Sequence, residues 1–389
     1  MSASNQPRQP NQQLSPKKIV LTGGGTGGHV NPNLALIPSL EENGWEVEYI
    51  GSKNGIEKQL VAQVGIPYHG ISSGKLRRYF DWQNFIDPLK VIKGIFDAYW
   101  AIAKIKPQVV FSKGGFVTVP VIFASWLQRI PVVIHESDFS SGLANRLSIP
   151  FATKVCVTFP ETVKHLAKYA DKVKHTGLPI RTDIFNGNAE KARELCGFDH
   201  QSPVLLIIGG SSGSAKINQA IRSVLDDLTQ TYQIVHACGK GNFDHTLQAH
   251  PRYRQFEYLG AELADVLALA DLVVSRSGAN AVFEFLTLRK PHLLIPLSKL
   301  SSRGDQILNA KSFQSRGYSA VLFEENLTSE SLLKAIADLA KRQDEYIQNM
   351  QQSEDKNAIA QIVELLTEVT CNEYHPHPPD SSPIKGEGE

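Results

Sequence analysis

Short runs of apolar residues alternate along the chain with longer stretches in which apolar and polar positions recur at helical spacing. The runs are rich in Val, Ile and Leu and are bounded by Gly, Pro and Ser. Strands that are covered by helices on both faces of a parallel sheet have this nearly continuous apolar character. The pattern therefore predicts an α/β fold with doubly wound parallel sheets and strands at residues 18–22, 47–50, 109–112, 132–135, 204–208, 233–237, 272–275 and 293–296.

The predicted strands fall into two halves with the same layout. Each half opens with a strand that leads into a glycine-rich loop and then a helix, with GGGTGG at residues 23–28 and GGSSG at 209–213. Gly and Pro interrupt the periodicity between residues 177 and 202. We therefore expect two Rossmann-like domains, residues 17–180 and 181–369, whose glycine loops face one cleft. The last helix can pack back on the first domain.

Composition narrows the class of protein. A length of 389 residues suits two domains, and 42% hydrophobic with 20% charged residues is globular composition. Residues 1–16 and 370–389 have too few apolar residues to offset their ordering entropy, so both tails are expected to be disordered. The net charge of +1 argues against a nucleic-acid partner. Four scattered cysteines, and the lack of a long apolar stretch or a signal-like N-terminus, indicate a cytoplasmic protein without structural disulfides or zinc.

The first glycine loop has the spacing GxGxxG directly after a strand. Glycines allow positive φ angles and close approach of a ligand, and the N-terminus of the next helix attracts an anion. Tight packing of strand against helix would also explain the glycines, but their recurrence at residues 209–213 favours binding of a diphosphate. The helix is expected to begin after His29, with Pro32 in its first turn, and Pro38 should kink or shorten it.

A nicotinamide-dependent dehydrogenase is an alternative that shares this loop. Such an enzyme normally places an acidic residue at the end of its second strand, where it binds the ribose hydroxyls. The second strand here ends in Gly51, Ser52 and Lys53, and its acidic residues, Glu46 and Glu48, come too early. The residues therefore fit a dehydrogenase poorly.

Polar residues gather again after the later strands. Ser277 to Asn280 form a turn, and the helix predicted at 281–288 carries one acid, Glu284, between two Phe residues. A carboxylate at this place suits bidentate hydrogen bonds to a sugar diol. The next helix begins with Asp305 and Gln306 and continues to Asn309, and such groups are typical of carbohydrate recognition. Helix capping would explain Asp305 alone.

Seven motifs occur in order between residue 17 and about residue 366. They are GGGTGGH (23–29), KGGFVTVP (113–120), HES (135–137) with GLANR (142–146), TGLPIR (176–181), GGSSGS (209–214), SRSGANAVFE (275–284) and GDQILNA (304–310). In these motifs the sequence resembles the MurG family of peptidoglycan N-acetylglucosaminyltransferases. The resemblance implies a GT-B fold and an inverting transfer of N-acetylglucosamine from UDP-N-acetylglucosamine (UDP-GlcNAc) to the undecaprenyl-linked acceptor lipid I, which makes lipid II.

The resemblance also implies which residues contact the donor. UDP would lie mainly on the second domain, and the acceptor on the first. The residues that match the family's donor contacts are Thr26, Gly27, Gly28, Asp138, Arg181, Ser211, Gly260, Ala279, Asn280, Ala281, Val282, Phe283, Glu284, Asp305 and Gln306. Glu284 is expected on the ribose. Asp138 stands where many members have Asn, and Gly260 where some have an Ile that touches the uracil.

The transfer needs a base that takes the proton of the acceptor hydroxyl. His29 has a suitable ordinary pKa, of about 6.5. Glu136 and Asp138 are alternative bases, and His29 could instead serve only to bond the loop or a phosphate. The sequence contains no motif that resembles the Asp-x-Asp metal site of the other large glycosyltransferase architecture. We therefore expect no metal site and no cofactor, with backbone N–H groups, helix ends and Arg181 stabilising the leaving group.

An acceptor that is embedded in a membrane requires a docking surface. Residues 76–105 mix aromatic and aliphatic residues with Lys and Arg, as segments that bind anionic headgroups do. Most of its apolar residues would be core, but subsets at 77–82 and 92–100 are expected to be exposed. Residues 17–180 contain 19 Lys/Arg against 12 Asp/Glu. We therefore expect the chain to be a peripheral protein on the cytoplasmic face of the cell membrane. Proteins of cell-wall synthesis are candidate partners.

Two further alternatives stay open from the sequence. A related glycosyltransferase could use another lipid acceptor, such as diacylglycerol. A non-catalytic protein could bind a UDP-sugar without transferring it.

Overall fold

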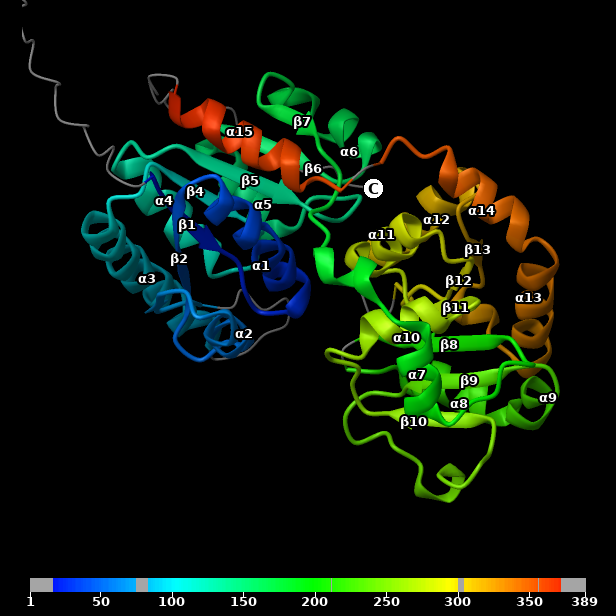
Figure 1. Cartoon of the computed structure of the whole chain (residues 1–389). Helices are drawn as coiled ribbons and strands as arrows, with labels where there is room; N and C mark the ends of the chain where they lie inside the picture. Colours follow the sequence, from blue (N-terminus) through cyan, green and yellow to red (C-terminus); the bar gives the residue numbers. More distant parts are fainter. Residues whose placement is uncertain (1–16, 75–82, 211, 300–303, 356, 372–389) are drawn as a thin grey trace, which may run out of the picture.

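The computed structural model describes residues 17–74, 83–210, 212–299, 304–355 and 357–371. The described residues form two parallel sheets (Figure 1). The first sheet has seven strands in the order β3-β2-β1-β4-β5-β6-β7. Its strands are β1 (Lys17–Thr22), β2 (Trp45–Ser52), β3 (Tyr68–Ile71), β4 (Val109–Ser112), β5 (Val132–Glu136), β6 (Lys154–Val157) and β7 (Val173–His175).

The second sheet has six strands in the order β10-β9-β8-β11-β12-β13. Its strands are β8 (Val204–Ile208), β9 (Gln233–Ala237), β10 (Tyr253–Phe256), β11 (Leu272–Ser275), β12 (His292–Leu294) and β13 (Ala320–Val321). Each of the eight predicted strands is present, in places extended or shortened by a few residues. The sequence pattern did not reveal the short strands β3, β6, β7, β10 and β13. The prediction of two doubly wound parallel sheets is confirmed.

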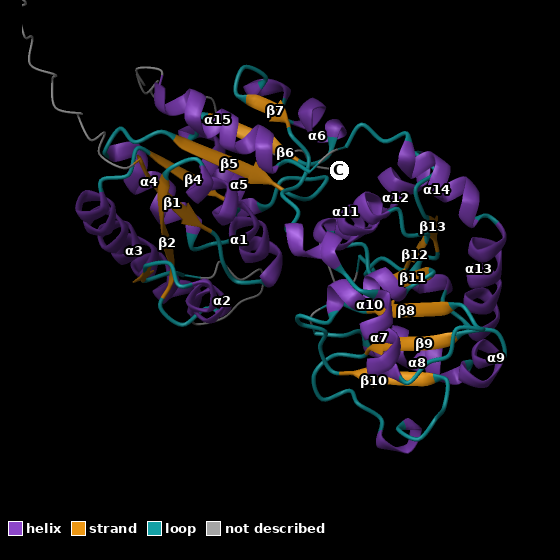
Figure 2. Ribbon diagram, viewed as in Figure 1, coloured by secondary structure: helices purple, strands orange, loops and turns teal. Residues whose placement is uncertain are grey.

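Helices flank both sheets (Figure 2). In the first domain they are α1 (Gly27–Glu42), α2 (Ile56–Val64), α3 (Gln83–Ile105), α4 (Thr118–Leu127), α5 (Leu143–Ser148) and α6 (Pro160–His165). The second domain contains α7 (Ala189–Cys196), α8 (Ala215–Ser223), α9 (Leu225–Thr229), α10 (Leu263–Leu269), α11 (Ala279–Leu288), α12 (Asp305–Ser315), α13 (Ser329–Lys341) and α14 (Gln343–Gln351). The last helix is α15 (Ile359–Cys371).

Helix α15 packs on the first domain, although it follows the second in sequence (Figure 1). Its buried residues Ile362 and Leu366 share a core with Val30 and Leu36 of α1. Where the chain crosses back, the Asn357 side chain donates to the Ile180 carbonyl over 2.9 Å and accepts from its N–H over 3.2 Å. The helix continues to residue 371, so residues 370 and 371, which were expected in the tail, are helical. The predicted disorder of residues 1–16 and 372–389 lies outside the described residues.

The first helix differs from its prediction. It begins at Gly27, two residues before His29, and it continues through Pro32 and Pro38 to Glu42. The expectation that Pro38 would shorten the helix is wrong, because tertiary burial of residues such as Leu36 and Leu40 outweighs the lost backbone bond.

The two domains contact each other through ion pairs and aromatic rings. Arg316, at the end of α12, pairs with Glu161 of α6 over 2.6 Å, and Asp355, which lies 2.9 Å from Arg316 in the same domain, is 3.4 Å from His175 of β7. The ring of Phe159 packs edge-on against Phe283 of α11, with centroids 5.2 Å apart. These contacts hold the carboxyl ends of the two sheets toward one another.

Candidate active site

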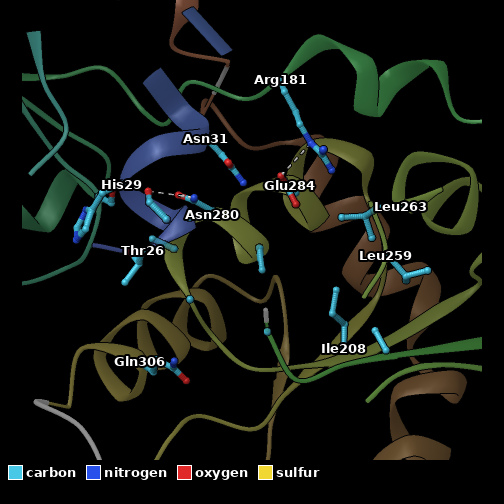
Figure 3. Close-up of a pocket in the computed structure, with 18 of the residues that line it drawn as sticks. Thr26, His29, Asn31, Arg181, Ile208, Leu259, Leu263, Asn280, Glu284 and Gln306 are labelled. Carbon is cyan, nitrogen blue, oxygen red and sulfur yellow. Dashed lines mark hydrogen bonds and ion pairs between the residues drawn. The ribbon is translucent and has the colours of Figure 1, made fainter. Parts of the chain in front are cut away.

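A cavity of about 420 Å³ lies between the two domains, and Figure 3 shows residues that line it. The lining residues of the first domain are Thr26, Gly27, Gly28, His29, Asn31, Ser137 and Asp138. The second domain contributes Ile208, Gly210, Ala237, Glu257, Tyr258, Leu259, Leu263, Gly278, Ala279, Asn280, Ala281, Glu284, Asp305 and Gln306, and Arg181 comes from the segment that joins the domains. Both glycine loops reach this cavity, as the sequence predicts.

The first glycine loop is shaped by a buried acid. Gly25 has a φ of 86°, in the left-handed region, and a Cβ at Gly24 would lie 2.6 Å from Glu57 Oε1. Glu57 accepts hydrogen bonds from the N–H of Gly25 over 3.2 Å and of Ser52 over 3.0 Å. Part of the loop's donor capacity is therefore used inside the protein, and the loop reaches the cavity through Thr26, Gly27 and Gly28. No local sequence pattern pointed to Glu57.

The orientation of His29 follows from its hydrogen bond to the chain after β4. Its Nδ1 lies 3.1 Å from the carbonyl oxygen of Lys113. A carbonyl can only accept, so the neutral imidazole carries its proton on Nδ1 and its lone pair on Nε2. In Figure 3, His29 and the apolar residues Leu259 and Ile208 lie at opposite sides of the cavity. The ring can therefore accept a proton on the side of the first domain.

A bond across the cleft joins the two domains close to His29. The Asn280 side-chain amide donates to the Gly28 carbonyl over 3.3 Å (Figure 3). Residue 32, one helical turn after Gly28, is proline and has no N–H to offer this carbonyl. The proline that seemed only tolerable in the sequence thus frees an acceptor for the other domain.

Glu136 does not line the cavity. It is buried, and its carboxylate accepts from the N–H groups of Asp138 and Gly142, each over 3.1 Å, and from the Asn145 amide over 2.8 Å. Burial, with the nearby charge of Asp138, raises the pKa of Glu136 to about 7. A carboxylate that already accepts three bonds and does not line the cavity is badly placed as a base, which argues against this candidate.

Asp138, in contrast, lines the cavity. Its carboxylate accepts from the Asn309 amide over 3.1 Å. Asn309 is fully buried and also accepts from the N–H of Phe139 over 3.1 Å. The sequence analysis had grouped Asn309 with carbohydrate-binding residues, but it instead links the two domains beneath the cavity.

The N-terminus of α11 points into the cavity, with Gly278, Ala279, Asn280 and Ala281 among the lining residues. Glu284, one turn later, lies on the same face. The side chains of Val282 and Phe283 lie on the opposite face, in the hydrophobic core. These two side chains therefore do not line the cavity, and the assignment of both residues as donor contacts stays a prediction.

The right side of the cavity in Figure 3 combines an ion pair with an apolar wall. Arg181 Nε lies 3.7 Å from Glu284 Oε1. Burial raises the pKa of Glu284 to about 7, although Arg181 acts in the opposite direction. Leu259, Leu263 and Ile208 supply apolar surface close by. An apolar wall beside a carboxylate matches the two halves of a nucleoside, the base and the ribose diol.

The remaining predicted residues divide between the cavity and its surroundings. Gln306 Oε1 accepts from the N–H of Leu297 over 3.0 Å, and Asp305 accepts from the Ser140 hydroxyl over 2.9 Å; both line the cavity. Gly260 does not line it, because its N–H turns to Glu262 over 3.1 Å, while residues 257–259 do. Ser211 lies outside the described residues.

Sequence reasoning also missed several residues that line the cavity. They are Asn31, Ser137, Ile208, Ala237, Glu257, Tyr258, Leu259 and Leu263. The sequence offered an indication only for those residues that are adjacent to a predicted site residue, such as Leu259 next to Gly260.

Comparison with protein families accounts for this two-domain site. The glycosyltransferase family 28 N-terminal domain matches residues 19–157, and the glycosyltransferase family 28 C-terminal domain matches residues 204–366. The chain belongs to glycosyltransferase family 28. Its membership makes it a hexosyltransferase and excludes the dehydrogenase alternative.

Curated members of family 28 are similar over nearly their whole length. A UDP-N-acetylglucosamine–N-acetylmuramyl-(pentapeptide) pyrophosphoryl-undecaprenol N-acetylglucosamine transferase of Geobacillus thermodenitrificans is 56% identical over 351 residues, which are 90% of this chain and 98% of that protein. The transferase 2 of the same name from Bacillus cereus is 54% identical over 352 residues, 90% of this chain and 99% of the relative.

Solved structures confirm the GT-B architecture. The crystal structure of Acinetobacter baumannii MurG is 26% identical and has a TM-score of 0.71, covering 91% of this chain and 100% of that one. The calicheamicin glycosyltransferase CalG4 shares the fold with a TM-score of 0.67 at 14% identity, covering 92% of this chain and 100% of that one. The cavity of this chain therefore lies between the two domains of a GT-B enzyme of family 28.

Proposed function

We propose that the chain transfers N-acetylglucosamine from UDP-GlcNAc to the C4 hydroxyl of the muramoyl sugar of lipid I and so forms lipid II for peptidoglycan. The proposal rests on the interdomain cavity. One side of the cavity combines an apolar wall with a carboxylate, as a nucleoside site does, and His29 lies at the other side. The names of relatives that are 54% and 56% identical over 90% of the chain support this donor and this acceptor.

The donor fits the cavity with its nucleotide on the second domain. The uracil would pack against Leu259 and Leu263, and the ribose diol would donate to the Glu284 carboxylate. The diphosphate would then lie at the N-terminus of α11 and the loop at Gly210, where backbone N–H groups and the helix dipole favour an anion. This placement leaves Asp305 and Gln306 for the hydroxyls of the transferred sugar.

Transfer proceeds as a single displacement. The acceptor C4 oxygen attacks C1 of the sugar as the bond from C1 to the diphosphate oxygen breaks, and UDP leaves with that electron pair. His29 takes the hydroxyl proton on Nε2, the nitrogen that the Lys113 carbonyl leaves unprotonated. The positive end of α11, together with Arg181, stabilises the charge that develops on UDP.

We propose that this transfer needs no divalent cation, because the α11 N-terminus and Arg181 supply the positive potential at the leaving group. Activity in excess EDTA should match activity in Mg²⁺. Loss of transfer in EDTA, restored by a divalent ion, would contradict this part of the proposal.

We also propose that α3 docks the enzyme on the cytoplasmic face of the membrane. Its exposed residues Leu89, Ile92, Phe96 and Trp100 have 52–69% of their surface accessible. In Figure 1, α3 lies on the side of the first domain that faces away from the second. Residues 77–82, the other predicted part of the surface, lie outside the described residues. None of the described helices is long and apolar enough to span a membrane.

The docking surface predicts binding to vesicles that contain anionic lipid, weakened by salt. Replacing Phe96 and Trp100 by Ala should reduce co-sedimentation about tenfold or more, since each side chain buries apolar area in the interface. Leu195→Ala, at a residue that is 50% exposed on α7 of the second domain, is the control and should bind normally. Binding that ignores lipid charge would refute the electrostatic part.

Transfer of labelled N-acetylglucosamine from UDP to a lipid I analogue tests the function directly. Formation of a lipid II analogue is expected. Binding of UDP-GlcNAc without transfer would identify a non-catalytic protein, and transfer only to a diacylglycerol acceptor would identify another glycosyltransferase.

A further inference from the structure

Three buried polar side chains form a continuous hydrogen-bonded chain beside the second glycine loop. They are Tyr253 at the start of β10, His236 of β9 and Asn218 of α8, and each is at most 3% exposed. The Tyr253 hydroxyl lies 2.7 Å from His236 Nδ1, and His236 Nε2 lies 2.9 Å from Asn218 Oδ1. The Asn218 amide nitrogen donates to the Cys238 carbonyl over 2.7 Å. The chain thus connects β10, at the edge of the sheet, with the residue that follows β9.

The direction of every bond in this chain is fixed. The Cys238 carbonyl can only accept, so the amide nitrogen of Asn218 faces it and Oδ1 faces His236. The neutral ring of His236 therefore donates from Nε2 and accepts on Nδ1 from the Tyr253 hydroxyl. Burial lowers the pKa of His236 to about 3 and raises the pKa of Tyr253 to about 12. Neither group changes its charge near neutral pH, so the chain keeps one polarity.

The far end of the chain meets the second glycine loop. Gly213 in the loop and Gly239 after β9 both have left-handed φ angles, of 73° and 92°. A Cβ at Gly213 would collide with the Cys238 carbonyl oxygen, and a Cβ at Gly239 would collide with the main chain of Gly213. The two segments therefore pack main chain against main chain. Each of them also lines the cavity, through Gly210 and Ala237, so a shift of the Cys238 carbonyl is passed to the wall of the cavity.

Asn218 joins this contact to the helix that follows the loop. It lies in the first turn of α8, and its N–H donates to the Ser214 carbonyl over 2.8 Å. Its side chain meanwhile holds the residue after β9. The glycine loop lies between these two points. The shape of the loop therefore depends on the orientation of the Asn218 amide, and His236 fixes that orientation.

We propose that His236 is a positioning residue for donor binding, which acts through Asn218 to hold the N–H groups of the second glycine loop in place for the diphosphate. This inference rests on the proposed function, in which the diphosphate of UDP-GlcNAc lies at that loop. A loop that is already ordered loses little freedom when the anion binds, so its loosening appears as weaker donor binding. Tyr253 keeps the ring in the tautomer that this role requires.

His236→Met removes the donor to Asn218 and leaves Oδ1 buried without a partner. UDP affinity, measured by calorimetry, should fall about fivefold or more, and KM for UDP-GlcNAc should rise to the same extent. The value of kcat at saturating donor should change less than about twofold, because the loss falls on donor binding. A lower kcat with unchanged KM and unchanged UDP affinity would overturn the proposal.

A conservative pair of substitutions tests the bond itself. Gln has an amide nitrogen at nearly the position of imidazole Nε2, so His236→Gln should recover most of the UDP affinity that His236→Met loses. The shorter side chain of His236→Asn cannot reach Asn218 and should bind UDP as weakly as His236→Met does. The same pair makes the comparison if His236→Met folds poorly. Equal UDP affinities in the Gln and Asn variants would contradict the role of the bond.

A double-mutant cycle tests whether His236 acts through Asn218. In an Asn218→Leu background, His236→Met should weaken UDP binding by less than about twofold further, because the residue that passes on its effect is already absent. Equal losses in the two backgrounds would show that His236 acts by another route and would overturn the proposal.

His292→Met is the matched control. His292 of β12 is another fully buried histidine of the second domain, its Nδ1 lies 2.7 Å from the Lys290 carbonyl, and it does not line the cavity. Its replacement should lower the melting temperature without changing UDP affinity. A loss of UDP affinity equal to that of His236→Met would assign both effects to general destabilisation.

Titration of UDP needs no acceptor, so it separates failure of this inference from failure of the proposed function. If the unmodified protein binds UDP but makes no lipid II, the proposed function fails, and the UDP affinities of the variants still decide the role of His236. If the unmodified protein does not bind UDP, this inference fails as well.

Discussion

The two glycine loops have similar backbones but opposite electrostatic surroundings. Each follows a central strand, and each contains a left-handed glycine, Gly25 with φ 86° and Gly210 with φ 89°. The first loop donates an N–H to the buried carboxylate of Glu57. The second is tied to a buried guanidinium, because Arg276 donates to Ser214 over 2.7 Å.

The support of the second loop carries a surplus of positive charge. Glu324 pairs with Arg276 over 2.5 Å and with Lys216 over 2.8 Å, so two cations meet one carboxylate. Burial alone would raise the pKa of Glu324, but these two partners hold it below its usual range. Ser214 in turn caps α8 by accepting from the N–H of Ile217 over 3.4 Å.

In the proposed mechanism, this difference lets the same loop backbone serve two tasks. A loop backed by a carboxylate has little to offer a diphosphate, and it instead presents His29 in the first turn of α1. A loop backed by cations favours the anionic leaving group. Four predictions test this division, in order of decreasing effect.

Arg276→Met should lower the free energy of unfolding by about 3–5 kcal/mol, because Glu324 stays buried without its nearest cation. It should also weaken UDP binding, since Ser214 loses its tether. Urea denaturation and UDP titration measure the two effects. Lys216→Met is the control at the same carboxylate. The Lys216 side chain is 63% exposed, so its loss should cost less than about 1 kcal/mol. Equal costs would contradict the role of burial.

His29→Ala should lower kcat about 10²-fold, because the first loop then presents no base. UDP affinity should change little, since we propose that the nucleotide binds mainly to the second domain. Steady-state kinetics and UDP titration check this prediction, and a variant with an unchanged kcat would remove His29 from the role.

Affinity for UDP-GlcNAc should depend on pH through Glu284. The ribose hydroxyls donate to an ionised carboxylate, so binding requires a deprotonated group whose pKa in the ligand-free protein is about 7. Affinity should be constant above this pH and should fall about tenfold per pH unit below it. Calorimetry from pH 5.5 to 8.5 measures the trend. Glu284→Gln should bind more weakly and without this dependence; a variant that kept it would assign the dependence to another group.

A matched pair of alanine substitutions gives the smallest effect. A Cβ at Gly25 or at Gly210 would meet no heavy atom within 4 Å, so both substitutions should cost about 1 kcal/mol of stability from the left-handed backbone alone. Gly25→Ala should act mainly on kcat, and Gly210→Ala on KM for UDP-GlcNAc. The same kinetic change in both variants would argue against the division of tasks.

Much of the architecture was readable from local pattern. The eight long apolar runs became strands, and both glycine loops met at one cavity, because a strand's burial and the direction of a parallel sheet are encoded within a few neighbouring residues. The helical face that presents Asn280 and Glu284 could also have been derived, since spacing of four residues places them together. The same spacing argument places the side chains of Val282 and Phe283 on the opposite face, in the core.

Other features depend on segments that lie far apart in the chain. Glu57 beneath Gly25, Lys113 between His29 and Ser137, and Asn309 beside Asp138 are contacts that span from 24 to 171 positions along the chain. Apolar periodicity indicates which side of a helix or strand is buried. It does not indicate which polar group of a distant element will contact that side. These residues acquire their roles from the way two separately folded sheets pack, and hydrogen-bond partners of buried polar groups are chosen at that stage.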